Sequence, residues 1–181
     1  MRVIDTAFSV REVQTTLSRT HAILEGLTAH ASPGALVFRE APGTWNALEI
    51  LSHVTDGEMT DWMPRVRIVL AASGDRRFTP FDREGGFVRY RGWSATALLA
   101  EFATLRARNL SELDGLRITP EQLRLEGLHP ELGAVTLQQL LATWATHDLA
   151  HVAQLARVLV RYTGRDVGPW VKYFSLLRGH N

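Results

Sequence analysis

The residues of this sequence best suited to chemistry are two histidines separated by three residues. His147 and His151 lie in the segment WATHDLAHVAQ, and Leu140, Trp144 and Leu155 recur at helical spacing around them. A helix here places both histidines on the apolar face, about one turn apart. Because a buried imidazolium pair is costly and neutral imidazole is a metal ligand, the pair indicates a divalent metal site. The alternative is two core histidines whose ring nitrogens are satisfied by hydrogen bonds.

A tight metal site needs a third ligand from elsewhere in the chain. A helical wheel places His53 just outside the apolar arc of its segment, which is typical of a surface residue but also suits an open metal site. His21 faces inward on another amphipathic segment and is the rival. The other histidines are His30, His129 and His180, which lie in predicted linkers or in the tail. His129 would reach the pocket only if its loop folds back.

Two polar neighbours of the histidine pair are candidate catalytic residues. Asp148 could orient a ligand histidine or accept a proton from metal-bound water. Its alternative role is an ordinary salt bridge at the edge of the helix. Gln154 lies one turn beyond His151 on the same face and could bond a ligand or the substrate, or it could be a satisfied polar residue of the helix seam.

Aromatic and basic residues around these candidates have simpler interpretations. The side chains of Trp45, Trp62 and Trp144 are expected in the core. A run of arginines between the second and third helical segments alternates with acidic residues, which is typical of a solvated loop; it comprises Arg76, Arg77, Arg83, Arg89 and Arg91.

Four segments with helical periodicity must position these residues, and nothing is typical of a run of strands. They cover approximately residues 6–29, 46–74, 94–115 and 136–164. Capping boxes at Asn46/Glu49 and Thr136/Gln139 mark the starts of the second and fourth segments, and Pro64 is a potential kink in the second. The fold class is therefore all-α, a four-helix bundle.

The connections constrain the topology only in part. The linker of about twenty residues between the second and third helices exceeds the roughly 2–8 residues usual between antiparallel neighbours, so these helices could be parallel. The next linker is similarly long, and length alone leaves the order open. The short apolar segment 168–177 is expected to form a C-terminal helix that covers the end of the bundle or makes a subunit contact.

Composition excludes several classes of protein. The chain has 181 residues, of which 45% are hydrophobic and 22% charged, as expected for one globular domain over residues 1–181. A net charge of +1 gives no support for a nucleic-acid or polybasic membrane partner. The absence of cysteine excludes disulfides, thiolate metal sites and a cysteine nucleophile. With no signal-peptide or membrane-spanning pattern, we expect a cytoplasmic protein.

Two long segments resemble a known family. TWNALEILSHVTDGEMTDWMPRV resembles the second helix of the DinB-like superfamily of bacterial four-helix-bundle metalloproteins, and GLHPELGAVTLQQLLATWATHDLAHVAQLARVL resembles the fourth. The intervening residues also follow the family pattern, so the resemblance covers nearly the whole chain. It implies a metal triad of His53, His147 and His151, which decides between His53 and His21. It further implies an up-down-down-up bundle, with a long crossover between the second and third helices, and a homodimer.

The resemblance also implies a choice of functions. Related proteins include thiol S-transferases that use bacillithiol, mycothiol or glutathione, a mycothiol-dependent isomerase, and members without an assigned activity. Our first hypothesis is a metal-dependent transferase that joins an exogenous low-molecular-weight thiol to a small electrophile. Zn²⁺ is the preferred metal, with Ni²⁺, Fe²⁺ and Mn²⁺ as alternatives.

Two alternatives remain open. A metal-dependent hydrolase is one, because HDLAH is similar to the zincin motif with Asp148 in place of glutamate, although aspartate is one methylene shorter. A non-catalytic, metal-stabilised binding or stress-response module is the other. For the enzymes among these, the partner is a small-molecule substrate.

Overall fold

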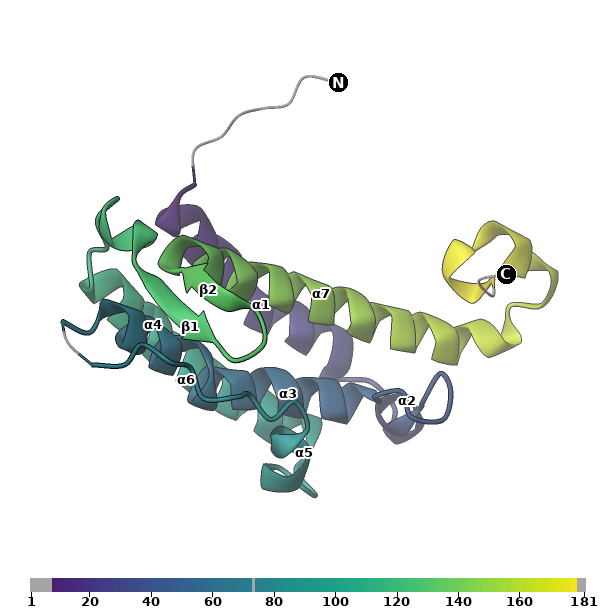
Figure 1. The fold of residues 1–181 in the computed structure, drawn as a ribbon. Helices are drawn as coiled ribbons and strands as arrows, with labels where there is room; N and C mark the ends of the chain where they lie inside the picture. The colour runs from purple at the N-terminus through teal and green to yellow at the C-terminus, as the bar shows by residue number, and fades with distance from the viewer. Residues whose placement is uncertain (1–7, 73, 179–181) are drawn as a thin grey trace, which may run out of the picture.

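A computed structural model describes residues 8–72 and 74–178 of the chain (Figure 1). The helices are α1 Val10–Thr28, α2 Pro33–Val37, α3 Ala47–Thr60, α4 Trp62–Leu70, α5 Gly85–Arg89, α6 Ala95–Gly115 and α7 Leu137–Thr163. The four long elements α1, α3–α4, α6 and α7 correspond to the four segments predicted from the sequence. The predicted start at residue 6 lies outside the described residues.

The four long elements form a bundle with up-down-down-up topology. Figure 1 shows α1 and α7 running in one direction, and α3–α4 and α6 running in the other. Helix α1 packs against α6 and α7, and α3 packs against α6 and α7. Parallel α3 and α6 require the chain between α4 and α6 to return along the bundle, which confirms the long crossover and the four-helix fold. That crossover covers residues 71–94 and includes the short helix α5.

Side chains adjacent to the helix starts account for where the long helices begin. The side chains of Ser9, Asn46, Ser94 and Thr136 accept hydrogen bonds from backbone N–H groups of the first turns of α1, α3, α6 and α7. Both predicted capping boxes form, because Glu49 and Gln139 bond back to the backbone of the cap residue. These local signals were readable from the sequence.

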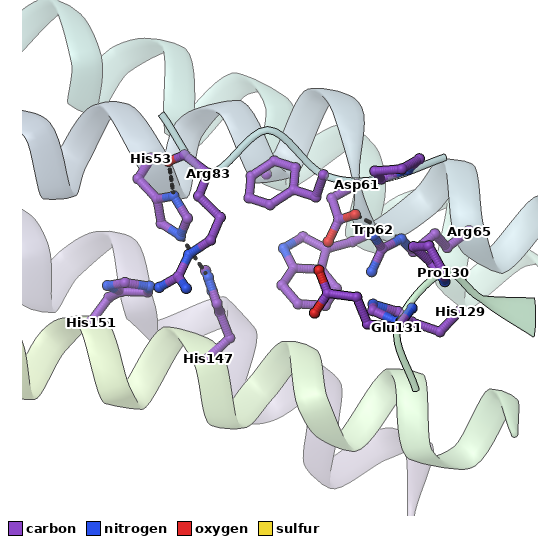
Figure 2. Close-up of a pocket in the computed structure, with 13 residues that line it drawn as sticks. His53, Asp61, Trp62, Arg65, Arg83, His129, Pro130, Glu131, His147 and His151 are labelled. Atoms are coloured by element: carbon purple, nitrogen blue, oxygen red, sulfur yellow. Dashed lines mark hydrogen bonds and ion pairs between the residues drawn. The ribbon is translucent and has the colours of Figure 1, made fainter. Parts of the chain in front are cut away.

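The second bundle element is broken where proline predicts a kink. Helix α3 ends at Thr60, Asp61 has φ −113° and ψ −66°, and α4 starts at Trp62. Pro64 has no N–H to donate to the carbonyl of Thr60, and its ring crowds that carbonyl. The break lies beside the candidate site and turns Asp61 and Trp62 towards it (Figure 2).

A β-hairpin precedes α7, where the sequence pattern predicted no strands. Antiparallel β1 (Glu126–His129) and β2 (Gly133–Thr136) pair with Glu126 opposite Thr136. Tertiary contacts hold this short hairpin in place, because the backbone N–H of Leu128 donates to the carbonyl of Arg76 in the crossover and the carbonyl of Leu128 accepts from the N–H of Phe78. A Cβ on Gly127 would lie 2.4 Å from the Phe78 ring, so that packing requires glycine. The sequence could not indicate this hairpin, because its two strands have only four residues each and the contacts that hold them come from a distant segment.

The buried apolar residues form two clusters, one towards each end of the bundle. One contains Leu17, Met63, Leu113 and Leu141, and the other contains Leu24, Leu51, Phe102 and Leu155, each with further neighbours. Each long element supplies apolar residues to both clusters. Along its sequence, buried polar residues separate those of one cluster from those of the other. These residues are Thr20, Glu58, Arg106, Asn109 and Asp148, and we call them the polar layer.

The C-terminal segment differs from the expected helix. It consists of short 3-10 turns over Gly164–Asp166, Gly168–Tyr173 and Ser175–Leu177, placed beyond the end of α7 (Figure 1). Trp170 and Tyr173 are exposed. The homodimer stays a prediction. In the described parts of the chain, no helix combines the length and apolar character needed to cross a membrane.

Candidate metal centre

Three imidazoles from two helices converge on one point. The Nε2 atoms of His53 on α3 and His147 on α7 are 2.9 Å apart, and the ring centroids of His147 and His151 are 4.3 Å apart. One nitrogen from each of the three rings lies within 4.8 Å of the others (Figure 2). His53 is buried and not at the surface, because the crossover covers the edge of the apolar arc where the helical wheel placed it. These three residues could hold a metal ion.

The tautomer of His53 follows from its hydrogen bond to the crossover. Its Nδ1 is 2.9 Å from the backbone carbonyl oxygen of Arg83. A carbonyl oxygen can only accept, so Nδ1 carries the proton and donates. The Nε2 atom of the neutral ring therefore presents its lone pair to the other imidazoles, as a metal ligand must.

His151 is held in the same way by a side chain of its own helix. Its Nδ1 lies 2.8 Å from Oε1 of Gln154, one turn further along α7. With Nδ1–H donating to this oxygen, Nε2 is the atom with a free lone pair. Gln154, an expected site residue, is thus placed where it orients a candidate ligand.

His147 has the least satisfied ring of the three. With the His53 lone pair directed at it, His147 Nε2 must donate the proton of their mutual hydrogen bond. That leaves His147 Nδ1 unprotonated, buried and, within the described part of the chain, without a hydrogen-bond partner; it lies 4.0 Å from the Asp148 carboxylate oxygen Oδ1. Two acceptors facing each other in a buried place are unfavourable. A cation held by His147 Nε2 would relieve this arrangement, because the ring proton would then reside on Nδ1 and face the carboxylate.

Burial keeps two of the three rings neutral. It lowers the pKa of His53 and of His151 from 6.5 to about 4, with the neighbouring histidines and the Arg83 charge adding to the effect. Hydrogen bonds to Arg83 and Gln154 oppose the shifts only in part. At neutral pH both imidazoles are therefore uncharged, which is the state that binds a metal ion.

Asp148 lies behind His147 and does not line the pocket. Its side chain is only 1% exposed, and its Oδ2 accepts hydrogen bonds from Arg106 at 2.7 Å and Thr20 at 2.6 Å. Burial raises the pKa of Asp148, but contacts with His147, Arg106 and Thr20 lower it further, so the group stays ionised. The alternative of a salt bridge at the helix edge is right about the pairing and wrong about the place, because the pair with Arg106 is buried. This geometry favours orienting His147 over accepting a proton in the pocket.

The histidines form one wall of a pocket with a volume of about 260 Å³. The helix break contributes Asp61, Trp62 and Arg65, and the crossover contributes Pro80, Phe81 and Arg83. The hairpin turn closes another side with His129, Pro130 and Glu131 (Figure 2). This volume suits a small ligand.

The remaining histidines take different positions. His129 lines the pocket, because its loop folds back as a hairpin, and its Nδ1 accepts from the backbone N–H groups of Glu131 and Leu132. His21 stacks on Phe102 away from the cluster, and His30 is exposed. His180 lies outside the described residues.

Several residues of the site carried no recognisable sequence signal. Arg83 belongs to an arginine run interpreted as solvated loop, yet it lines the pocket. Glu58 and Arg106 are buried beneath the site, paired at 2.8 Å, although charged residues in helices are usually exposed. The Trp62 side chain is buried as expected but also lines the pocket, while Trp45 is half-buried and contacts His53 and His151.

Comparison with known proteins assigns the family. The DinB superfamily model matches residues 13–155, which is most of the chain and includes all three clustered histidines. The chain belongs to the DinB superfamily. Among solved structures it is similar to YfiT from Bacillus subtilis, with a TM-score of 0.74 and 16% sequence identity over 91% of this chain and 94% of that one. YfiT is described as a probable metal-dependent hydrolase with an unusual four-helix-bundle topology. A search of functionally curated proteins returned no significant match.

The donor set of this DinB-superfamily chain fits a divalent cation. Two rings direct lone pairs towards a common point, and the third has a buried nitrogen that becomes satisfied only when its proton moves. Three imidazole ligands leave positions for a further small ligand on zinc and similar ions. The ligand roles of His53, His147 and His151 stay a prediction, and the geometry supports it.

Proposed function

We propose that this chain is a metal-dependent enzyme whose three-histidine centre activates a small nucleophile for attack on a small electrophile. The supporting observation is the cluster of His53, His147 and His151 in the wall of a 260 Å³ pocket, with two lone pairs directed to one point. A divalent ion, with Zn²⁺ preferred, supplies Lewis acidity that lowers the pKa of a thiol or of water.

The first candidate reaction is transfer of a low-molecular-weight thiol. The chain has no cysteine, so the sulfur must come from an exogenous cosubstrate. In such a transfer the sulfur bonds to the electrophilic carbon, the leaving group departs with its electron pair, and the thiol proton passes to a base. Phe81 and Trp62 provide apolar walls for the electrophile.

Asp61 is the carboxylate best placed to take that proton. It lines the same pocket, and burial raises its pKa to about 6, an effect that the nearby Arg65 charge opposes only in part. The Arg65 guanidinium holds the carboxylate through an ion pair of 2.7 Å. A base whose pKa lies near the working pH is efficient in both accepting and releasing a proton.

Hydrolysis is the second candidate, and the pocket carboxylates favour it. Asp61 and Glu131 could each receive a proton from an attacking water, with no second cosubstrate needed. YfiT, which shares the fold, is described as a probable metal-dependent hydrolase. The same centre would serve either reaction, and the nucleophile distinguishes them.

Elemental analysis and activity measurements test the proposal. Untagged protein should contain about one divalent ion per chain, and a panel of thiol–electrophile pairs and simple esters should show turnover that a chelator abolishes. His147→Ala should remove both metal binding and turnover, whereas the matched variant His30→Ala, at an exposed histidine, should retain both. Undiminished turnover in His147→Ala would reject the proposal, and metal binding without turnover would favour a non-catalytic module.

A further inference from the structure

Arg83 is a cation beside the histidine cluster with no acidic partner. It lies on the crossover, is exposed and lines the pocket. Within residues 8–72 and 74–178, its guanidinium forms no ion pair, whereas Arg65 in the same pocket is paired with Asp61 at 2.7 Å. Figure 2 shows the side chain reaching from the crossover towards the three imidazoles.

The position of Arg83 is defined by contacts on both sides of its side chain. Its backbone carbonyl accepts the Nδ1–H of His53 at 2.9 Å, and its Cζ lies 5.9 Å from the ring centroid of Trp45. Trp45 in turn stacks on His151, with 6.0 Å between ring centroids and 11° between planes. The guanidinium is therefore held next to the convergent lone pairs.

An unpaired guanidinium at this place works against metal binding. Its positive charge repels a divalent cation held by the neighbouring imidazoles, and no described carboxylate neutralises it. An anionic group that sits between the guanidinium and the metal position removes this repulsion and pairs with both. A planar guanidinium presents parallel N–H donors that match the two oxygens of a carboxylate.

The other charges of the pocket limit what this anion can be. Arg65 is already neutralised by Asp61, and Glu131 adds a carboxylate to the hairpin wall. Among the described residues that line the pocket, Arg83 is thus the cation without an acidic partner, and the hairpin wall carries the negative charge of Glu131. A compact ligand with a single negative charge suits this distribution better than a dianion does.

We propose that Arg83 binds a carboxylate of the substrate, so that the preferred substrates are small molecules with one carboxylate adjacent to the reacting atom. This inference rests on the proposed function, because it names the substrate class of the same centre. It makes Arg83 a specificity-determining residue, and it separates this arginine from its neighbours in the arginine run. Arg77, for example, is exposed and paired with Asp75.

Ligand binding to Co²⁺-loaded protein tests the assignment without turnover. Benzoate and its neutral analogue benzamide are titrated while the visible Co²⁺ spectrum is recorded. Parent protein should prefer benzoate, and Arg83→Gln should reduce that preference at least about tenfold, the usual effect of losing a charge-assisted hydrogen bond. Arg83→Lys should retain part of the preference, and the control Arg77→Gln should retain all of it.

The Co²⁺ affinity separates this role from a merely structural one. Arg83→Gln removes a positive charge that repels Co²⁺, so the variant should bind Co²⁺ as tightly as the parent protein or somewhat more tightly. Damage to the site would instead weaken Co²⁺ binding. An unchanged benzoate preference in Arg83→Gln would overturn the inference. Phosphate binding more tightly than benzoate would overturn its assignment to a carboxylate.

A titration of metal-free protein keeps the two proposals distinguishable. Benzoate should shift the arginine Nε–H nuclear magnetic resonance signal that disappears in Arg83→Gln, and should leave the Arg77 signal in place. A protein that shows this shift but no turnover would contradict the proposed function alone. Turnover without any Arg83-dependent binding would contradict only the substrate class.

Discussion

Two polar regions lie on the same helices, and they differ in how completely their groups are satisfied. In the polar layer, the Glu58 carboxylate accepts bonds from Arg106, Asn109 and Trp144, and all of these side chains are buried. In the histidine cluster, five residues away on α3 and adjacent on α7, His147 Nδ1 has no hydrogen-bond partner in the described structure. The charged groups of the polar layer are paired within the chain, although the amide oxygen Oδ1 of Asn109 has no partner in the described structure. In the histidine cluster the atom without a partner belongs to a candidate metal ligand.

The difference indicates what each region does. Buried charges that are paired with one another hold helices in register and offer no uncompensated charge to a ligand. Imidazoles with convergent free lone pairs have the opposite property. Asp148 connects the two, since Arg106 and Thr20 hold it in the polar layer while its other oxygen faces His147.

The largest expected effect of a single substitution is on stability and comes from the polar layer. Arg106→Met leaves the carboxylates of Glu58 and Asp148 buried without their cation, which should cost about 3–5 kcal/mol of unfolding free energy. Urea denaturation of the metal-free protein measures it. Arg77→Met is the control, because its pair with Asp75 is exposed and should contribute less than about 1 kcal/mol. Similar losses in the two variants would contradict the assignment of Arg106 to a buried network on which the fold depends.

The next effect is a pH dependence that originates in the histidine cluster. Between pH 6.5 and about 4 the unfolded chain protonates His53 and His151, whereas the folded chain does not, because its pKa values are about 4. The metal-free protein should therefore lose stability on acidification across this window, by up to about 1.4 kcal/mol per pH unit for each histidine.

A variant isolates this contribution from other titrating groups. The raised pKa of Asp61, about 6, acts in the opposite direction, because the folded state then binds more protons than the unfolded state below that pH. His53→Gln/His151→Gln retains Asp61 and should show a flatter loss of stability on acidification between pH 6.5 and 4. Parallel profiles for parent and variant would show that the two imidazoles are not desolvated as described.

A smaller effect separates stability from metal binding within the polar layer. Thr20→Val removes the 2.6 Å hydrogen bond to Asp148, which should destabilise the fold by about 1.5–3 kcal/mol because the acceptor is charged. Arg106 still holds the carboxylate, so Zn²⁺ affinity by calorimetry should stay close to that of the parent. A large loss of Zn²⁺ affinity would place Thr20 in the metal centre.

The smallest effect is confined to the histidine cluster. Gln154→Met removes the acceptor that orients His151, which should weaken Zn²⁺ binding about tenfold, or about 1.4 kcal/mol, with little change in metal-free stability. Gln138→Met, at an exposed glutamine of the same helix, should change neither quantity. Equal Zn²⁺ affinities in the two variants would exclude an orienting role for Gln154.

Local sequence signals determined where the long helices lie and which two histidines of the cluster, His147 and His151, share a helix face. Apolar periodicity and the capping residues Asn46 and Thr136 depend only on neighbours in the chain, so they predict where helices lie and begin. The spacing of His147 and His151 fixes their common face for the same reason. Periodicity could not place His53, and only the resemblance to the DinB family favoured it over His21.

Tertiary structure decided everything that depends on contacts between distant segments. The crossover buries His53 and sets its tautomer through Arg83, and the hairpin brings His129 to the pocket. Charged residues such as Arg106 look like ordinary surface residues in the sequence, because what makes them tolerable in the interior is a set of partners on three other helices. Free energies of burial and pairing are properties of the assembled neighbourhood, and no single helix contains that neighbourhood.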